Sequence, residues 1–170
     1  MDERRESNDS KPVPNRTAVQ RKSERELVVT RTVNAPARLV FAAWTQAELF
    51  RRWWVPQSYG LTLLDCTMDV RVGGPYRLVF QHGEATMEFF GTYLEVVPHA
   101  RLVWTNDEGD QGQTITTVTF TETAGKTLVV VEDHYPTKEA LESGSSEAMP
   151  EALDQLEALL ASLGAGAEAP

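Results

Sequence analysis

The chain has 170 residues and a mass of 18.9 kDa, enough for one hydrophobic core but too short for two. It is 41% hydrophobic and 24% charged, which fits a globular protein and excludes collagen-like, wholly disordered and disulfide-rich classes. Cys66 is the one cysteine of the sequence, so the chain cannot form an intramolecular disulfide or a cysteine-based zinc cluster.

The charge is divided unevenly along the chain. Residues 1–25 hold seven basic and five acidic side chains, leaving nine basic and twenty acidic side chains and a net charge of −11 in residues 26–170. An acidic body repels phosphate backbones, so we expect no nucleic-acid partner. The sequence has neither a long apolar run nor an apolar segment near its charged start, which predicts a cytoplasmic protein without membrane insertion.

The first elements are predicted from apolar spacing. Residues 1–25 contain few apolar side chains and are expected to be a disordered tail that precedes a domain over 26–164. Residues 26–33 alternate in polarity and predict a strand, followed by a helix that begins near Pro36. Thr45 is expected to cap a second short helix, which carries Leu49, Phe50, Trp53 and Trp54 and ends at Pro56.

From Leu61 onward, apolar and polar residues alternate for about seventy residues, the period of two that is typical of strands. Short breaks separate the segments and allow only antiparallel connections, because a parallel crossover needs a dozen or more residues. The breaks are Gly73-Gly74, His82-Gly83, Pro98-His99, Asp107–Gly112 and Ala124-Gly125. The six predicted strands are 61–71, 75–81, 85–97, 101–106, 113–123 and 126–134.

The helical period returns at the end of the chain. Met149, Leu153, Leu156, Leu160 and Leu163 form one apolar stripe, and we expect the helix to stop at Gly164-Ala165-Gly166, with residues 165–170 frayed. The order of strand, two short helices, six-stranded meander and long helix predicts an α+β helix-grip fold. A curved antiparallel sheet of about seven strands would wrap around the last helix and leave a cavity between them.

Several segments resemble a known family. They are NAPARLVFAAWTQAELFRRWWVP (34–56), MDVRVGGPYRLVF (68–80), GTYLEVVPHARLVWT (91–105) and TVTFTE (117–122). They are similar to the SRPBCC (START-like) superfamily, and within it to bacterial proteins that resemble the activator of heat shock protein 90 ATPase. The resemblance implies a helix-grip fold, whereas its members include lipid carriers, receptors, enzymes and co-chaperones.

The sequence departs from those relatives at Ala148-Met149-Pro150, where they carry a Gly-Trp or Gly-Met pair. Proline disfavours the helical conformation of the residue before it, which predicts a kink or a helix start near Met149. Residues 137–148 would then form a short helix or loop over the cavity mouth.

The last predicted strand contains the candidates for chemistry. Leu128, Val130, Glu132 and His134 share one face, which the resemblance implies points into the cavity. Burial there would raise the pKa of the Glu132 carboxyl and suit it to acid/base work with His134, and Tyr93 is a further candidate. The alternative is structural, with Glu132 paired to a neighbour and His134 in solvent.

Other predicted site residues are largely apolar. Strand alternation and the resemblance give a set of possible ligand contacts, for which core packing is the alternative reading at each position. The set, which includes the candidates above, is Trp53, Trp54, Met87, Phe89, Tyr93, Val118, Phe120, Val130, Glu132, Met149 and Leu153.

Other site types find no support in the sequence. His82, His99 and His134 lie in separate segments without metal-ligand spacing, so no metal is expected. Gly73-Gly74 lacks the context of a dinucleotide-binding loop, and no cofactor is expected. We assign Gly73-Gly74 to a tight turn, in which Arg71 ties a loop carboxylate or carbonyl.

Three functions are compatible with these features. The first is binding of a small hydrophobic ligand, lipid-like or aromatic, by a monomer or homodimer. The second is a cyclase, dehydratase or hydrolase that uses a cavity carboxylate and histidine. The third, implied by the resemblance, is a co-chaperone-like domain with a chaperone partner whose ATPase it stimulates. The sequence favours the first.

Overall fold

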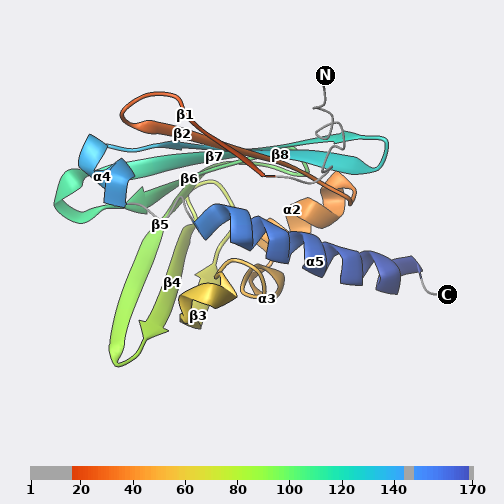
Figure 1. The fold of residues 1–170 in the computed structure, drawn as a ribbon, viewed down its shortest axis with the longest axis horizontal. Coiled ribbons are helices and arrows are strands. Elements are labelled where there is room, and N and C mark those ends of the chain that lie inside the picture. Colours follow the sequence, from red (N-terminus) through yellow and green to blue (C-terminus); the bar gives the residue numbers. More distant parts are fainter. Residues whose placement is uncertain (1–16, 144–147, 169–170) are drawn as a thin grey trace, which may run out of the picture.

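The structure is a computed structural model that describes residues 17–143 and 148–168. Within these residues eight antiparallel strands form one curved sheet in the order β1-β2-β8-β7-β6-β5-β4-β3 (Figure 1). The predicted α+β helix-grip architecture is therefore confirmed. The strands are β1 (Ala18–Arg21), β2 (Glu26–Val33), β3 (Thr62–Met68), β4 (Pro75–His82), β5 (Ala85–Val97), β6 (Arg101–Asp107), β7 (Gln113–Thr123) and β8 (Lys126–His134).

The helices cover the concave face of the sheet. The long helix α5 crosses that face, with α2 and α3 beside it, while α4 lies at the far end of β7 and β8 (Figure 1). The α-helices of the described residues are α2 (Ala37–Thr45), α3 (Ala47–Phe50), α4 (Lys138–Ser143) and α5 (Met149–Glu168), and the 3-10 turns are η2 (Gln57–Tyr59) and η3 (Gly109–Gln111).

The core lies between α5, α2 and the sheet. Leu153, Leu156 and Leu160, spaced three and four residues apart along α5, are fully buried. Trp44 of α2 packs against Trp53 with ring centroids 4.8 Å apart. Each fully buried leucine contributes roughly 1.5–3 kcal/mol to stability, so this stripe holds α5 on the sheet.

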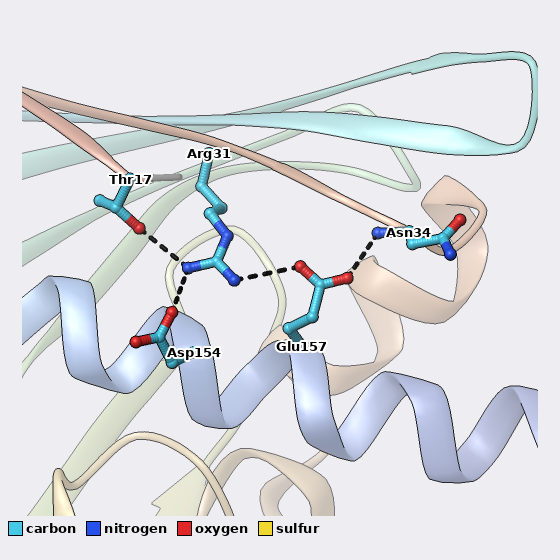
Figure 2. A network of polar contacts seen from close by, with 5 residues as sticks. All are labelled: Thr17, Arg31, Asn34, Asp154 and Glu157. Atoms are coloured by element: carbon cyan, nitrogen blue, oxygen red, sulfur yellow. Dashed lines mark hydrogen bonds and ion pairs between the residues drawn. The ribbon is translucent and has the colours of Figure 1, made fainter. Parts of the chain in front are cut away.

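A buried arginine also ties α5 to the sheet. Arg31 of β2 is 5% exposed, and its guanidinium donates to Asp154 at 2.5 Å and to Glu157 at 3.2 Å (Figure 2). It also donates to the Thr17 hydroxyl at 3.0 Å, and Glu157 accepts a bond from the Asn34 backbone N–H at 2.8 Å. The network joins the first part of the chain to the middle of α5.

The turn between β3 and β4 has the predicted structural role. Arg71 Nε donates to the Asp69 carboxylate at 3.0 Å, and Gly73 has a φ of +86°, in the left-handed region that favours glycine. A Cβ atom at Gly74 would lie 2.0 Å from the Asp69 carbonyl oxygen, so this position accepts no larger residue.

The prediction of a disordered tail over residues 1–25 is wrong for Ala18–Arg21. These four residues form β1, which pairs with the edge of β2 from Ala18↔Thr30 to Arg21↔Leu27. All four are exposed, so backbone hydrogen bonds hold the strand in place of apolar burial. Residues 1–16 of the predicted tail lie outside the described residues.

Two helix boundaries also differ from expectation. Helix α3 ends at Phe50, before the two tryptophans, and the hydroxyl of Thr45 donates to the Phe41 carbonyl in place of capping α3. Helix α5 starts at Met149, as Pro150 predicts, but it continues through Gly164-Ala165-Gly166 to Glu168. A glycine within a helix costs only about 1 kcal/mol relative to alanine and does not by itself end it, so the predicted stop and frayed end are wrong through Glu168.

Candidate functional site

A cavity of about 390 Å³ lies between the start of α5, the segment after α3 and the concave face of β3 to β8. The sheet is too strongly bent for one helix to fill it, and α4 and α5 are separate helices at this end of the molecule. The residues that line the cavity are Val29, Trp44, Phe50, Trp54, Val55, Pro56, Tyr59, Leu61, Met68, Tyr76, Leu78, Phe80, Met87, Phe89, Tyr93, Trp104, Asn106, Glu108, Thr114, Thr116, Val131, Asp133, Tyr135, Ala148, Met149 and Ala152.

Aromatic rings form much of the apolar wall. Phe50 and Trp54 stack with centroids 4.6 Å apart, and Phe80 meets Phe89 edge to face at 5.2 Å. Three lining side chains are partly open to solvent: Tyr59 (41% exposed), Met87 (40%) and Phe89 (37%). We identify these three as the cavity mouth.

Helix α5 holds the aromatic wall through one glutamine. The Gln155 side-chain amide donates to the carbonyl oxygens of Trp53 and Val55, both at 2.9 Å. Its oxygen accepts a bond from the Gln57 backbone N–H at 2.9 Å. These bonds fix the turn segment around Trp54, so the apolar wall is part of the folded scaffold.

The other end of the cavity is polar. Thr116 of β7 donates its hydroxyl hydrogen to Asp133 Oδ1 at 2.6 Å. Two residues before Thr116 on β7, the Thr114 hydroxyl donates to Glu108 Oε2. The same oxygen also accepts a bond from Asn106 Nδ2 at 3.4 Å. Two carboxyl groups therefore lie at the end of an otherwise apolar cavity, each with a threonine hydroxyl as a donor.

Burial changes the acidity of this end. It raises the pKa of Asp133 to about 6, an effect opposed by the Thr116 hydrogen bond and by His134 and reinforced by the charge of Glu108. Burial also raises the pKa values of Tyr76, Tyr93 and Tyr135, so these phenols remain neutral at physiological pH. The cavity therefore contains a carboxyl group, that of Asp133, whose pKa lies near neutrality.

The predicted orientation of the last strand is wrong by one residue. Thr127, Val129, Val131 and Asp133 face the core and cavity, whereas Leu128, Val130, Glu132 and His134 lie on the outer face. Val131 pairs with Val29 of β2, and both are buried. Both faces of Thr127–Val131 are apolar enough for strand alternation alone to be ambiguous, and the resemblance selected the wrong one.

The predicted carboxylate–histidine pair is consequently not in the cavity. His134 is 52% exposed, and its Nδ1 lies 3.1 Å from the carboxylate of Glu26. Glu132 lies beside it on the outer face, opposite Val28 and Thr117 of the adjacent strands. Tyr93, the third candidate, does line the cavity.

The other predicted ligand contacts divide into two groups. The cavity is lined by Trp54, Met87, Phe89, Tyr93 and Met149. Core packing instead accounts for Trp53, Val118, Phe120 and Leu153, which are buried. Trp53 also donates its indole N–H to the Ala43 carbonyl at 2.9 Å, which fixes the ring in the core.

Sequence reasoning missed the polar end of the cavity. Asp133, Glu108, Thr114 and Thr116 were not among the predicted site residues, although Thr114 and Thr116 lie on the same face of β7 as Val118 and Phe120. The apolar alternation of β2, at Leu27, Val29 and Val33, was the available signal for the orientation of β8, because paired residues of adjacent strands share a face.

Three further features bear on the kind of protein and site. No group of three or more His, Cys, Asp or Glu side chains that could hold a metal ion occurs among residues 17–143 and 148–168. Cys66 is buried, and burial raises the pKa of its thiol. Every helix in the described part of the chain is too short or too polar to cross a lipid bilayer.

The fold and sequence are similar to those of known proteins. The family model described as Activator of Hsp90 ATPase homolog 1-like protein matches residues 34–161. The solved structure of a Nitrosomonas europaea protein has 26% sequence identity to this chain and a TM-score of 0.74, and the match covers 85% of this chain and 99% of that chain. The solved structure of a Staphylococcus epidermidis protein also has 26% sequence identity, with a TM-score of 0.71, and the match covers 86% of this chain and 94% of that chain.

A protein of Rhodobacter sphaeroides has the same fold, with 24% identity and a TM-score of 0.78 over 86% of this chain and 99% of that chain. No curated protein matches the chain.

Proposed function

We propose that this chain, which belongs to the family of Activator of Hsp90 ATPase homolog 1-like proteins, binds a small hydrophobic or amphipathic molecule in the cavity between α5 and the sheet. The observation that carries the proposal is the cavity itself. Its volume of about 390 Å³ lies within the range of small-molecule sites, and aromatic side chains from helices and strands form much of its wall.

The cavity can supply useful affinity without a large rearrangement. An aromatic ligand that buries about 200 Å² of apolar surface gains roughly 5 kcal/mol before the loss of translational and rotational freedom. The stacked Phe50 and Trp54 rings and the hydrogen bonds of Gln155 keep the wall in place. The ligand therefore meets a preformed surface, which lowers the entropy cost of binding.

The observations favour binding over the two other functions. An enzyme that uses Glu132 and His134 loses its pair, because both side chains lie on the outer face of β8. The cavity does contain the carboxyl of Asp133, to which this proposal gives a role in ligand recognition. A co-chaperone role rests on family resemblance, whereas the cavity is a feature of this structure.

Binding can be tested with the neutral fluorescent probe N-phenyl-1-naphthylamine. Ala148 lines the cavity at the start of α5, so Ala148→Trp should fill the space and weaken probe binding at least tenfold. Val72→Trp is the matched control, because Val72 is 64% exposed and does not line the cavity. Equal binding by both variants and the original chain would contradict the proposal, provided that circular dichroism shows both variants folded.

Native mass spectrometry of freshly purified protein is an independent test. A retained small molecule should be present in the original chain and reduced in Ala148→Trp. Retention that is equal in both proteins would place the molecule outside the cavity.

A further inference from the structure

The charged groups of the cavity are all acidic. Glu108 and Asp133 are the carboxyl side chains of its lining, and the described lining residues include no lysine, arginine or histidine. The rest of the chain adds to this potential, since residues 26–170 carry a net charge of −11. An anionic ligand would meet repulsion at the polar end, and a cationic one would meet attraction.

Each of these carboxyl groups has an oxygen that the described residues leave without a donor. Thr116 donates to Asp133 Oδ1, and no described residue donates to Oδ2. Thr114 and Asn106 both donate to Glu108 Oε2, and none donates to Oε1. A carboxylate oxygen in an apolar cavity is stabilised by a donor, and most strongly by a charged one.

The two carboxyl groups act on one another. The charge of Glu108 contributes to the raised pKa of Asp133, although the Thr116 hydrogen bond and the neighbouring His134 oppose the rise. It also contributes to the raised pKa values of Tyr76 and Tyr135. Two like-charged carboxylates at one end of an apolar cavity repel each other, and a bound cation would relieve this repulsion.

We propose that the ligand is an amphipathic amine, whose protonated amino group binds Asp133 and Glu108 while its apolar body packs against the aromatic wall. This inference rests on the proposed binding function and names the class of ligand. The amine supplies donors to the free carboxylate oxygens. The rings of Phe50, Trp54, Phe80 and Phe89 accommodate an aromatic or short aliphatic body.

The test compares two probes of the same shape, 1-naphthylmethylamine and 1-naphthylmethanol, by calorimetry at pH 7.5. The amine is protonated at this pH and the alcohol is neutral, so the difference isolates the charge. We expect the amine to bind at least tenfold more tightly. In Asp133→Asn this preference should fall below threefold, because the charged acceptor is lost.

Glu132→Gln is the matched control. It removes a carboxylate from the adjacent residue, whose side chain lies on the opposite face of β8, and it should keep the full preference for the amine. If Asp133→Asn does not fold, Glu108→Gln provides the second variant, and the preference should fall in it as well.

The outcomes separate the two proposals. Equal or tighter binding of the alcohol would overturn the amine assignment while leaving cavity binding intact. A preference for the amine that survives in Asp133→Asn, or one that is lost in Glu132→Gln, would also overturn it. Failure of both probes to bind would contradict the amine assignment and the proposed function together.

Discussion

The half-buried carboxyl of Asp133, which lines the cavity, predicts a specific dependence of stability on pH. Burial raises its pKa from an ordinary value of 3.8 to about 6. Because the folded state holds the proton more tightly than the unfolded state, the unliganded protein carries no penalty from this group below about pH 3.8. It loses stability as pH rises through the window up to about 6.

The size of the effect follows from the shift. One pKa unit corresponds to 1.36 kcal/mol, so a shift of about 2 units makes Asp133 destabilising by about 3 kcal/mol at pH 7, and by about 2 kcal/mol more at pH 7 than at pH 4. Asp133→Asn removes this titration but keeps an oxygen that accepts the Thr116 hydroxyl. Relative to the original chain, the variant should therefore gain about 2 kcal/mol between pH 4 and pH 7.

Urea unfolding followed by tryptophan fluorescence at pH 4, 5, 6 and 7 measures the effect. Glu132→Gln is again the control, because its side chain lies on the outer face of β8, and its stability should follow that of the original chain within about 0.5 kcal/mol. The reasoning is refuted if the Asp133→Asn curve runs parallel to that of the original chain, or if Glu132→Gln flattens the curve by the same amount.

Other predictions concern packing and the attachment of α5. Phe120→Ala, at a buried core position, should destabilise by about 3–5 kcal/mol in urea unfolding, and Phe89→Ala at the cavity mouth by about 1–2 kcal/mol; equal losses would contradict the distinction. Arg31→Met should cost about 2 kcal/mol, since the half-buried Glu157 keeps the Asn34 backbone N–H but loses its charged partner, while Asp154 is solvated; an unchanged unfolding midpoint would disprove this attachment. Deletion of residues 1–21 should cost only about 1–2 kcal/mol, because it removes the backbone hydrogen bonds of β1, whose side chains are exposed, and the hydrogen bond from Arg31 to Thr17; a loss above about 4 kcal/mol would show that the segment packs more extensively.

The strands were predictable where turn residues and alternation agree. The six segments of the meander match β3 to β8 closely, because glycine, proline or a polar cluster interrupts the alternation at each turn. Pro150 likewise marks the start of α5 at Met149. These signals are local in sequence, and the structure follows them.

The faces of a strand are less predictable than its limits. Strand β8 contains Leu128, Val129, Val130 and Val131 in succession, so its alternation does not identify the buried side. The pairing with β2 decides it, and that pairing joins residues about 100 positions apart. The cavity carboxyl is therefore Asp133 and not Glu132, a difference of one residue that moves the charge from the outer face into the cavity.

Pairing at the edge of the sheet explains why the prediction of disorder was wrong for Ala18–Arg21. The side chains of β1 are exposed, and neither apolar content nor periodicity distinguishes Ala18–Arg21 from a disordered segment. The strand forms because β2 would otherwise present unpaired backbone groups at the edge of the sheet. Such pairing depends on the partner strand, which local composition does not describe.

The central claim, that a ligand occupies the cavity, is tested most directly by methionine methyl NMR. Of the four methionines in the sequence, Met68, Met87 and Met149 line the cavity, while Met1 lies outside the described residues. In protein labelled with ¹³C at the methionine methyl groups, bound N-phenyl-1-naphthylamine should give intermolecular NOEs to the methyl groups of Met68, Met87 and Met149. Saturable binding of the probe without NOEs to Met68, Met87 or Met149 would contradict the claim.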